Sequence, residues 1–99
     1  IIKADANLVT NTQRGTCLEK NGVTIQTCEH VLAALVGLEI DNVLIELSTS
    51  EPPIMDGSSK HFVEALEKAG IVVQEAKREE YIVNEIISYK DEETGSEII

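Results

Sequence analysis

The chain has 99 residues, 42% of them hydrophobic and 3% aromatic, and it carries a formal net charge of −10. This length suits one small domain, or one domain and part of another, with an aliphatic core. Its acidic surface would repel phosphates, which excludes nucleic acid and anionic membrane surfaces as expected partners. No run of residues has the character of a signal peptide or a membrane-spanning helix, so we expect a cytoplasmic protein and not an integral membrane protein.

The two cysteines, Cys17 and Cys28, lack the short spacing of a metal-binding pair. We expect both to be reduced side chains of small hydrophobic character. The chain opens with Ile1-Ile2 and closes with Ile98-Ile99, and both ends read as strand interiors. We therefore expect the sequence to be a fragment of a longer protein.

The first third of the chain predicts strands and a hairpin. Residues 7–10 read as a strand and residues 11–15 as a polar loop. Two further strand-like runs, 16–20 and 23–27, flank Asn21-Gly22, whose residues tolerate a positive φ. This pattern predicts a hairpin with a tight two-residue turn.

A helix is predicted over residues 28–38, directly after the hairpin, with the hydroxyl of Thr27 capping its first turn. No charged residue lies between His30 and Glu39, so we expect this helix to be buried on most sides. Another layer or a ligand can approach the face of His30 closely because its helical neighbours there are small. These neighbours are Ala33, Ala34 and Gly37.

The next segment repeats the strand-then-helix order. We expect a largely buried strand over residues 43–48, a proline-containing turn that ends at Asp56-Gly57, and an amphipathic helix from about residue 58 to residue 69. A further strand is expected over residues 71–75. This order predicts an α+β fold in which two helices pack on one face of a mixed sheet.

A charged segment near residue 76 is the predicted domain boundary. We expect residues 1–76 to be the later part of one domain and residues 77–99 to be the opening strands of a second. Within the second part, strands over residues 81–89 and 96–99 are expected to flank a turn over residues 91–95.

Glu29 and His30 are the candidate catalytic pair. Both lie in the first turn of a predicted helix, where the helix dipole favours an ionised carboxylate and a neutral imidazole. Such a pair suits metal-assisted hydrolysis, with the imidazole as ligand and the carboxylate as proton shuttle. In the alternative interpretation both are packing residues. His61 is expected on the solvent face of the second helix and not as a metal ligand.

Three motifs occur together: residues 27–35 (TCEHVLAAL), Asp41-Asn42 and residues 53–58 (PIMDGS). With residues 15–18 (GTCL), they resemble the UDP-3-O-acyl-N-acetylglucosamine deacetylase family, the zinc amidases of bacterial lipid A synthesis. The resemblance implies two similar domains, each with a ribosomal protein S5 domain 2-like fold, and a site between their helical layers. The chain would pack against a second deacetylase domain, and the early strands of its own domain would lie upstream.

The resemblance also implies roles for individual residues. His30 matches the one zinc ligand that the family draws from its first domain, and Glu29 matches the general base that activates the attacking water. Arg14 and Gly15 match a strand that approaches the metal and are candidate substrate-pocket residues, Arg14 being an unusually polar choice there. The other ligands, a His and an Asp, and a further catalytic His belong to the second domain, so we expect this chain alone to be inactive.

The implied activity is hydrolysis of the N-acetyl group of UDP-3-O-(3-hydroxyacyl)-N-acetylglucosamine, the committed step of lipid A biosynthesis. The implied partners are therefore a UDP-sugar lipid substrate and Zn²⁺. Some members of the family continue into a hydroxyacyl-carrier-protein dehydratase, which makes such a fusion a further expectation. The alternative function is a non-catalytic, acidic α+β interaction module on the same fold.

Overall fold

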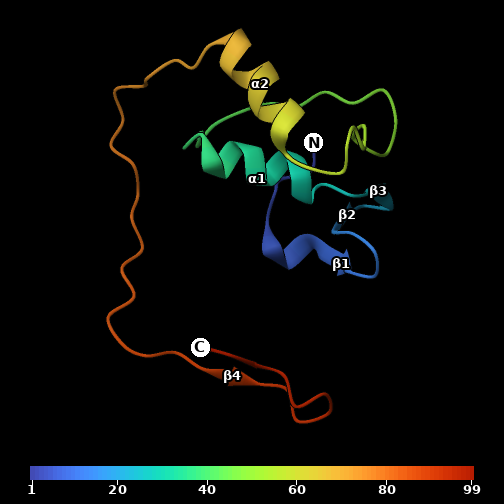
Figure 1. The fold of residues 1–99 in the computed structure, drawn as a ribbon, viewed down its shortest axis with the longest axis vertical. Helices are drawn as coiled ribbons and strands as arrows, with labels where there is room; N and C mark the ends of the chain where they lie inside the picture. Colours follow the sequence, from blue (N-terminus) through green and yellow to red (C-terminus); the bar gives the residue numbers. More distant parts are fainter.

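The computed structural model describes residues 1–99 and consists of a folded part and an extended C-terminal arm (Figure 1). The elements of the folded part are η1 (Ala6–Leu8), β1 (Val9–Asn11), β2 (Cys17–Lys20), β3 (Val23–Ile25), α1 (Glu29–Gly37) and α2 (Lys60–Ala69). The arm ends in a hairpin of β4 (Tyr89–Lys90) and β5 (Glu97–Ile98). Two helices with antiparallel sheets confirm the predicted α+β class.

The first hairpin forms as predicted. β2 lies between β1 and β3 in a three-stranded antiparallel sheet, and Lys20 pairs with Val23 next to the turn. Asn21 and Gly22 have φ values of 53° and 74°. A two-residue turn of this kind needs the left-handed backbone at both positions, because only then does its twist match that of the strands.

Helix α1 begins close to its predicted start, but the predicted cap is wrong. Thr27 has a φ of 49°, and the N-cap position is taken by Cys28, whose side chain makes no capping hydrogen bond. A capping Thr needs an extended backbone, which the left-handed Thr27 does not have. Instead, the amide and the thiol of Cys28 both donate to the carbonyl oxygen of Thr16, at 3.2 and 3.3 Å.

Helix α2 is joined to the first turn of α1. The hydroxyl of Ser59 donates to the carbonyl oxygen of His30 at 2.8 Å. The turn before α2 forms as predicted, with the carboxylate of Asp56 accepting from the amide and the hydroxyl of Ser58 at 3.0 and 2.8 Å. The helix ends as predicted at Ala69, and Gly70 follows it with a φ of 88°. Neither α1 nor α2 has the length and apolar character of a membrane-spanning helix.

The hydrophobic core is small. Its buried members are Leu18, Cys28, Val31, Ala34 and Leu35. Val36 on the opposite side of α1 is 78% exposed, so the prediction of a helix buried on most sides is wrong. A compact domain of this length has a radius of gyration of about 13 Å, whereas this chain has one of 15.9 Å. The difference reflects the arm, which leaves the folded part after α2 (Figure 1).

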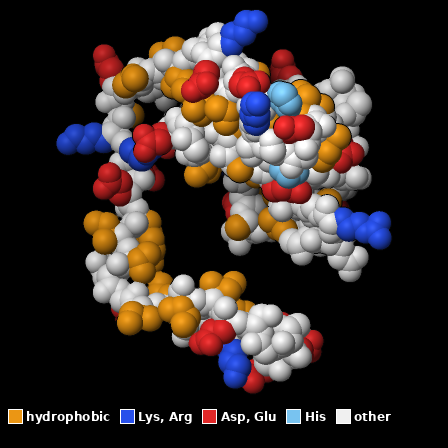
Figure 2. Space-filling view, viewed as in Figure 1, with side chains coloured by type: hydrophobic (Ala, Val, Ile, Leu, Met, Phe, Trp, Pro, Cys, Tyr) orange, Lys and Arg blue, Asp and Glu red, His pale blue; other side chains and the backbone are white.

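Two predicted strands, over residues 43–48 and 71–75, do not form, and of the strand predicted over residues 81–89 only Tyr89 lies in a strand, β4. Residues 43–48, 71–75 and 81–88 belong to no sheet, and apolar side chains within them are exposed, Leu44 by 70% and Val72 by 85%. Their apolar pattern suits a strand, but a strand is stable only when another strand pairs with it. Figure 2 shows hydrophobic side chains gathered along the arm. The predicted turn over residues 91–95 does form, between β4 and β5.

The turn of the first hairpin provides a test of this fold. Replacing Gly22 with alanine is expected to lower the free energy of unfolding by about 1 kcal/mol, because a Cβ disfavours the left-handed backbone. Gly22→Asn is the matched control and should lose less, since asparagine tolerates this conformation. Urea denaturation of the full-length protein measures both, and equal midpoints for the two variants would contradict the turn geometry.

Candidate functional site

Glu29 is fixed by a backbone group of the neighbouring sheet. The amide of Thr16, which precedes β2, donates to Oε2 of Glu29 at 2.8 Å. The carbonyl oxygen of the same residue accepts from the amide and the thiol of Cys28. Thr16 therefore holds both the carboxylate of Glu29 and the backbone that leads into it.

The surroundings of Glu29 favour its ionised form. The Thr16 amide, followed by the amide of Glu29 itself and the nearby His30, holds the pKa of the Glu29 carboxyl below its ordinary value, and partial burial opposes this. Its side chain is 34% exposed, so water reaches it. At neutral pH, Glu29 is thus an ionised carboxylate with one oxygen, Oε2, bound to the backbone.

His30 lies beside the free oxygen of this carboxylate. Its Nε2 is 4.0 Å from Oε1 of Glu29, which is too long for a hydrogen bond. The imidazole is 28% exposed and makes no hydrogen bond within the chain, whereas the backbone of His30 is fixed by the hydroxyl of Ser59. The structure thus brings the predicted pair together at a partly exposed position, and His30 does not have the satisfied environment of a core histidine.

Gly15 is the predicted pocket residue nearest to the pair. A Cβ at this position would lie 3.3 Å from Oε1 of Glu29 and 3.3 Å from the hydroxyl of Thr27. The backbone of Gly15 therefore lies so close to the carboxylate that even a Cβ would make a tighter than ordinary contact. A larger residue would push Glu29 or Thr27 away.

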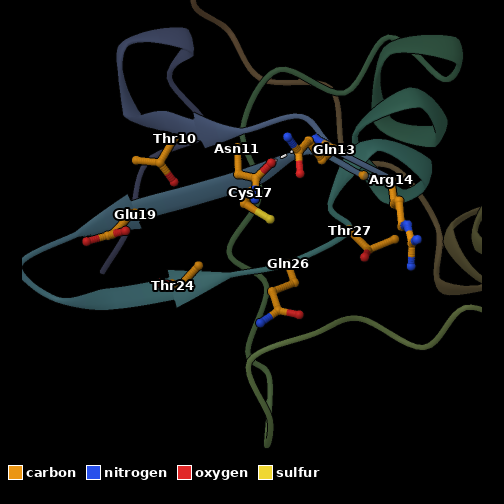
Figure 3. Close-up of a pocket in the computed structure, with 10 residues that line it drawn as sticks. Thr10, Asn11, Gln13, Arg14, Cys17, Glu19, Thr24, Gln26 and Thr27 are labelled. Atoms are coloured by element: carbon orange, nitrogen blue, oxygen red, sulfur yellow. Dashed lines mark hydrogen bonds between the residues drawn. The ribbon is translucent and has the colours of Figure 1, made fainter.

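Arg14 and Thr27 each line two open polar grooves. The first groove, of about 400 Å³, follows the sheet from Thr10 to Thr27 (Figure 3). The second, of about 660 Å³, lies against residues 49–54. Neither groove is lined by Glu29 or His30. The two predicted pocket residues therefore differ, because Gly15 lies close to the carboxylate whereas Arg14 lines only these grooves.

The donor set fits one part of a metal site. No group of three or more His, Cys, Asp or Glu side chains is placed to hold a metal ion. A catalytic zinc needs three protein ligands, and at this turn the chain offers one free imidazole. His61 does not join it, because it is exposed on α2 and lies 3.6 Å from Asp56 and 3.3 Å from Glu64.

The cysteines do not extend the donor set. Both are free, Cys28 being buried and Cys17 partly buried. Burial is the main cause that raises the pKa of the Cys28 thiol, so it stays protonated at neutral pH. A thiol in this form is a poor metal ligand and a poor nucleophile.

Sequence reasoning missed the two contacts that position the pair. Thr16 acts through its backbone amide and carbonyl, which every residue other than proline has, so the residue type at this position does not indicate the contact. Ser59 takes the N-cap position of α2, but its side chain makes no capping hydrogen bond, and its hydroxyl binds the His30 carbonyl instead. The small size of Gly15, directly before Thr16, was the available sign that another group comes close there.

Known proteins match most or all of this chain. The family model described as UDP-3-O-acyl N-acetylglycosamine deacetylase matches residues 1–99. The bifunctional enzyme LpxC/FabZ of Bacteroides thetaiotaomicron is 48% identical over 98 residues, which cover 99% of this chain and 21% of that protein. The UDP-3-O-acyl-N-acetylglucosamine deacetylase of Xanthomonas oryzae pv. oryzae is 48% identical over 90 residues, covering 91% and 30%.

The same-named deacetylase of Xanthomonas campestris pv. campestris is 58% identical over 78 residues, covering 78% of this chain and 26% of that protein. The chain thus spans between 21% and 30% of the length of these curated relatives.

The close approach of Gly15 predicts the effect of a single methyl group. Gly15→Ala should push Oε1 aside, weaken the Thr16 contact and raise the pKa of Glu29 toward its ordinary value. Because the folded-state pKa is lowered, the stability that Glu29 contributes is present above its unfolded pKa and is lost as the pH falls through the folded pKa. In Gly15→Ala, the free energy of unfolding should therefore fall less as the pH is lowered through the pKa of Glu29.

Carboxyl NMR titration of the full-length protein measures this shift. Gly37→Ala is the matched control, since a Cβ there meets no atom within 4 Å. An unchanged Glu29 titration in Gly15→Ala would show that the carboxylate does not depend on this contact.

Proposed function

We propose a function for the full-length protein on the premise that this chain belongs to the UDP-3-O-acyl N-acetylglycosamine deacetylase family. The full-length protein hydrolyses the N-acetyl group of UDP-3-O-(3-hydroxyacyl)-N-acetylglucosamine, releasing acetate and a free amine, and thereby commits this sugar lipid to lipid A synthesis in the cytoplasm. One observation carries the proposal: a carboxylate held ionised by the Thr16 amide faces an unbound imidazole at the start of α1.

In this proposal Glu29 is the general base. Its Oε2 is bound to the Thr16 amide, so Oε1 is the oxygen with a free lone pair. Oε1 takes the proton from the water that attacks the acetamide carbonyl. The lowered pKa suits this task, because a general base must be ionised before it can accept a proton.

His30 provides one ligand for zinc through Nε2. Zinc, when bound, supplies a Lewis acid that polarises the amide carbonyl. The Ser59 hydroxyl holds the backbone of His30, and Nε2 lies 4.0 Å from Oε1 of Glu29. Gly15 leaves room for that carboxylate, and Arg14 lines the approach for the substrate.

The remaining ligands come from outside this chain. Residues 77–99 open the second domain, which packs on the helices of the first and completes the site. Exposed apolar side chains such as Val36 and Leu44 support such packing, since apolar surface of this kind marks interfaces. The bifunctional relatives support a further proposal, that the full-length protein continues into a hydroxyacyl-carrier-protein dehydratase.

Replacing Glu29 with glutamine tests the base directly. The amide oxygen of glutamine can still accept from Thr16, but it cannot take a proton at neutral pH. We expect deacetylation by the full-length protein to fall by about a hundredfold or more, with zinc content unchanged. An unchanged rate would identify the Glu29–His30 pair as packing residues and would favour the non-catalytic module.

The incomplete donor set predicts the behaviour of the 99-residue chain alone. It should bind no stoichiometric zinc at micromolar metal and should show no deacetylase activity, because it lacks two of the three ligands. Metal analysis after dialysis, with the full-length protein as the positive control, measures this. Tight one-to-one zinc binding by the chain alone would contradict the proposed division of ligands.

A further inference from the structure

The segment between α2 and β4 is held to the folded part at two neighbouring points. Residues 71–88 form no helix or strand, and their hydrogen bonds run to residues 39–42 alone. The side chain of Gln74 accepts from Asn42 at 2.8 Å. The other point is the guanidinium of Arg78. These two contacts therefore hold the first part of the segment against the folded part, and the free arm begins after them.

Arg78 binds both a carboxylate and a backbone carbonyl. Its Nε and Nη2 donate to Oδ2 of Asp41 at 3.1 and 3.0 Å, and Nη2 also donates to the carbonyl oxygen of Glu39 at 2.7 Å. The planar guanidinium can make these bonds together, whereas the single ammonium of a lysine cannot reproduce the fork. Glu39 lies just beyond the end of α1, where the helix dipole favours a cation.

Helix α1 therefore connects this contact to the candidate site. Glu29 and His30 occupy its first two positions, and the Arg78–Asp41 pair lies just past its last residue, Gly37. A helix of this length spans about 13 Å and behaves as a rigid rod. The position of residue 78 relative to the carboxylate and the imidazole thus depends on this helix and on the contacts that Arg78 and Gln74 make with residues 39–42, among them the Arg78–Asp41 pair and the 3.8 Å approach of the Arg78 guanidinium to the Glu39 carboxylate.

We propose that Arg78 is a positioning residue, whose pairing with Asp41 fixes the start of the following chain relative to Glu29 and His30. The inference rests on the proposed function, in which that following chain supplies the other metal ligands. Breaking the pair leaves Glu29 and His30 unchanged in themselves. It removes one of the two contacts that hold the segment leading to their partners, so the completed site is held less exactly.

A double-mutant cycle in the full-length protein tests this role. The variants are Arg78→Gln, Asp41→Asn and their combination, with Arg78→Lys as the conservative variant. Lys77→Gln is the matched control, because it removes a charge from the same segment but from a side chain that forms no ion pair. The measurements are kcat and KM for deacetylation, zinc content and the thermal unfolding midpoint.

Each single variant should lower kcat by about tenfold, which is less than the roughly hundredfold loss that a 1 Å misplacement of a reacting group can cause. KM, zinc content and the unfolding midpoint should stay unchanged. The combined variant should lose no more than the worse single variant, since both remove the same pair. Arg78→Lys should recover part of the loss, and Lys77→Gln should match the wild type.

Several outcomes would overturn the inference. Arg78→Gln with the kcat of Lys77→Gln rejects the positioning role while leaving the proposed function standing. Additive losses in the combined variant reject the pairing, and a loss that follows a lowered unfolding midpoint reduces Arg78 to a structural residue. A folded, zinc-containing wild type without deacetylase activity overturns the proposed function, and the positioning role with it.

Discussion

The two hydrogen-bonding groups of the Thr16 backbone determine the candidate site. The carbonyl oxygen binds Cys28 and the amide binds Glu29, so one residue holds both the entry to α1 and its first side chain. Thr16 directly precedes β2, the central strand of the sheet, whose position is set by pairing on both sides. Backbone polar groups in a half-buried place must find partners. The orientation of Glu29 is therefore a consequence of the hairpin register, and it does not depend on a large core.

The approach to α1 contains backbone strain that these contacts hold in place. Thr27 is β-branched and has a φ of 49°, a conformation that L-residues other than glycine adopt at a cost of about 1–2 kcal/mol. Hydrogen bonds secure both of its neighbours: the amide of Gln26 donates to Ser50 at 2.8 Å, and that of Cys28 to Thr16 at 3.2 Å. Strain that the surroundings enforce in this way is typical of functional sites. Here it turns the chain so that Glu29 faces the sheet.

The features predicted correctly from sequence are those that short segments specify. Asn21-Gly22 defines its own turn, and α2 ends at the predicted residue, Ala69, before Gly70, whose φ of 88° suits glycine. The strands expected over residues 43–48 and 71–75 do not form, and of the strand expected over residues 81–89 only Tyr89 pairs, in β4. An apolar pattern indicates that a strand would be buried, but it does not identify the strand with which it would pair. The adjacency of Glu29 and His30 was visible in the sequence. The contacts that orient them were not, because a backbone amide and a backbone carbonyl carry no residue-type signal.

The spacing between Glu29 and His30 favours separate tasks for the two side chains. A hydrogen bond between Oε1 and Nε2 would place a proton on Nε2, where a metal would bind, and would occupy a lone pair of Oε1, which would otherwise accept a proton. At 4.0 Å the two atoms form no such bond, so Oε1 stays free to accept a proton and Nε2 stays free to bind a metal. Successive helix residues point about 100° apart, and one side chain here is held by the sheet while the other has its backbone held by α2. The separation that suits the proposed hydrolysis thus follows from two elements acting on neighbouring residues from different sides.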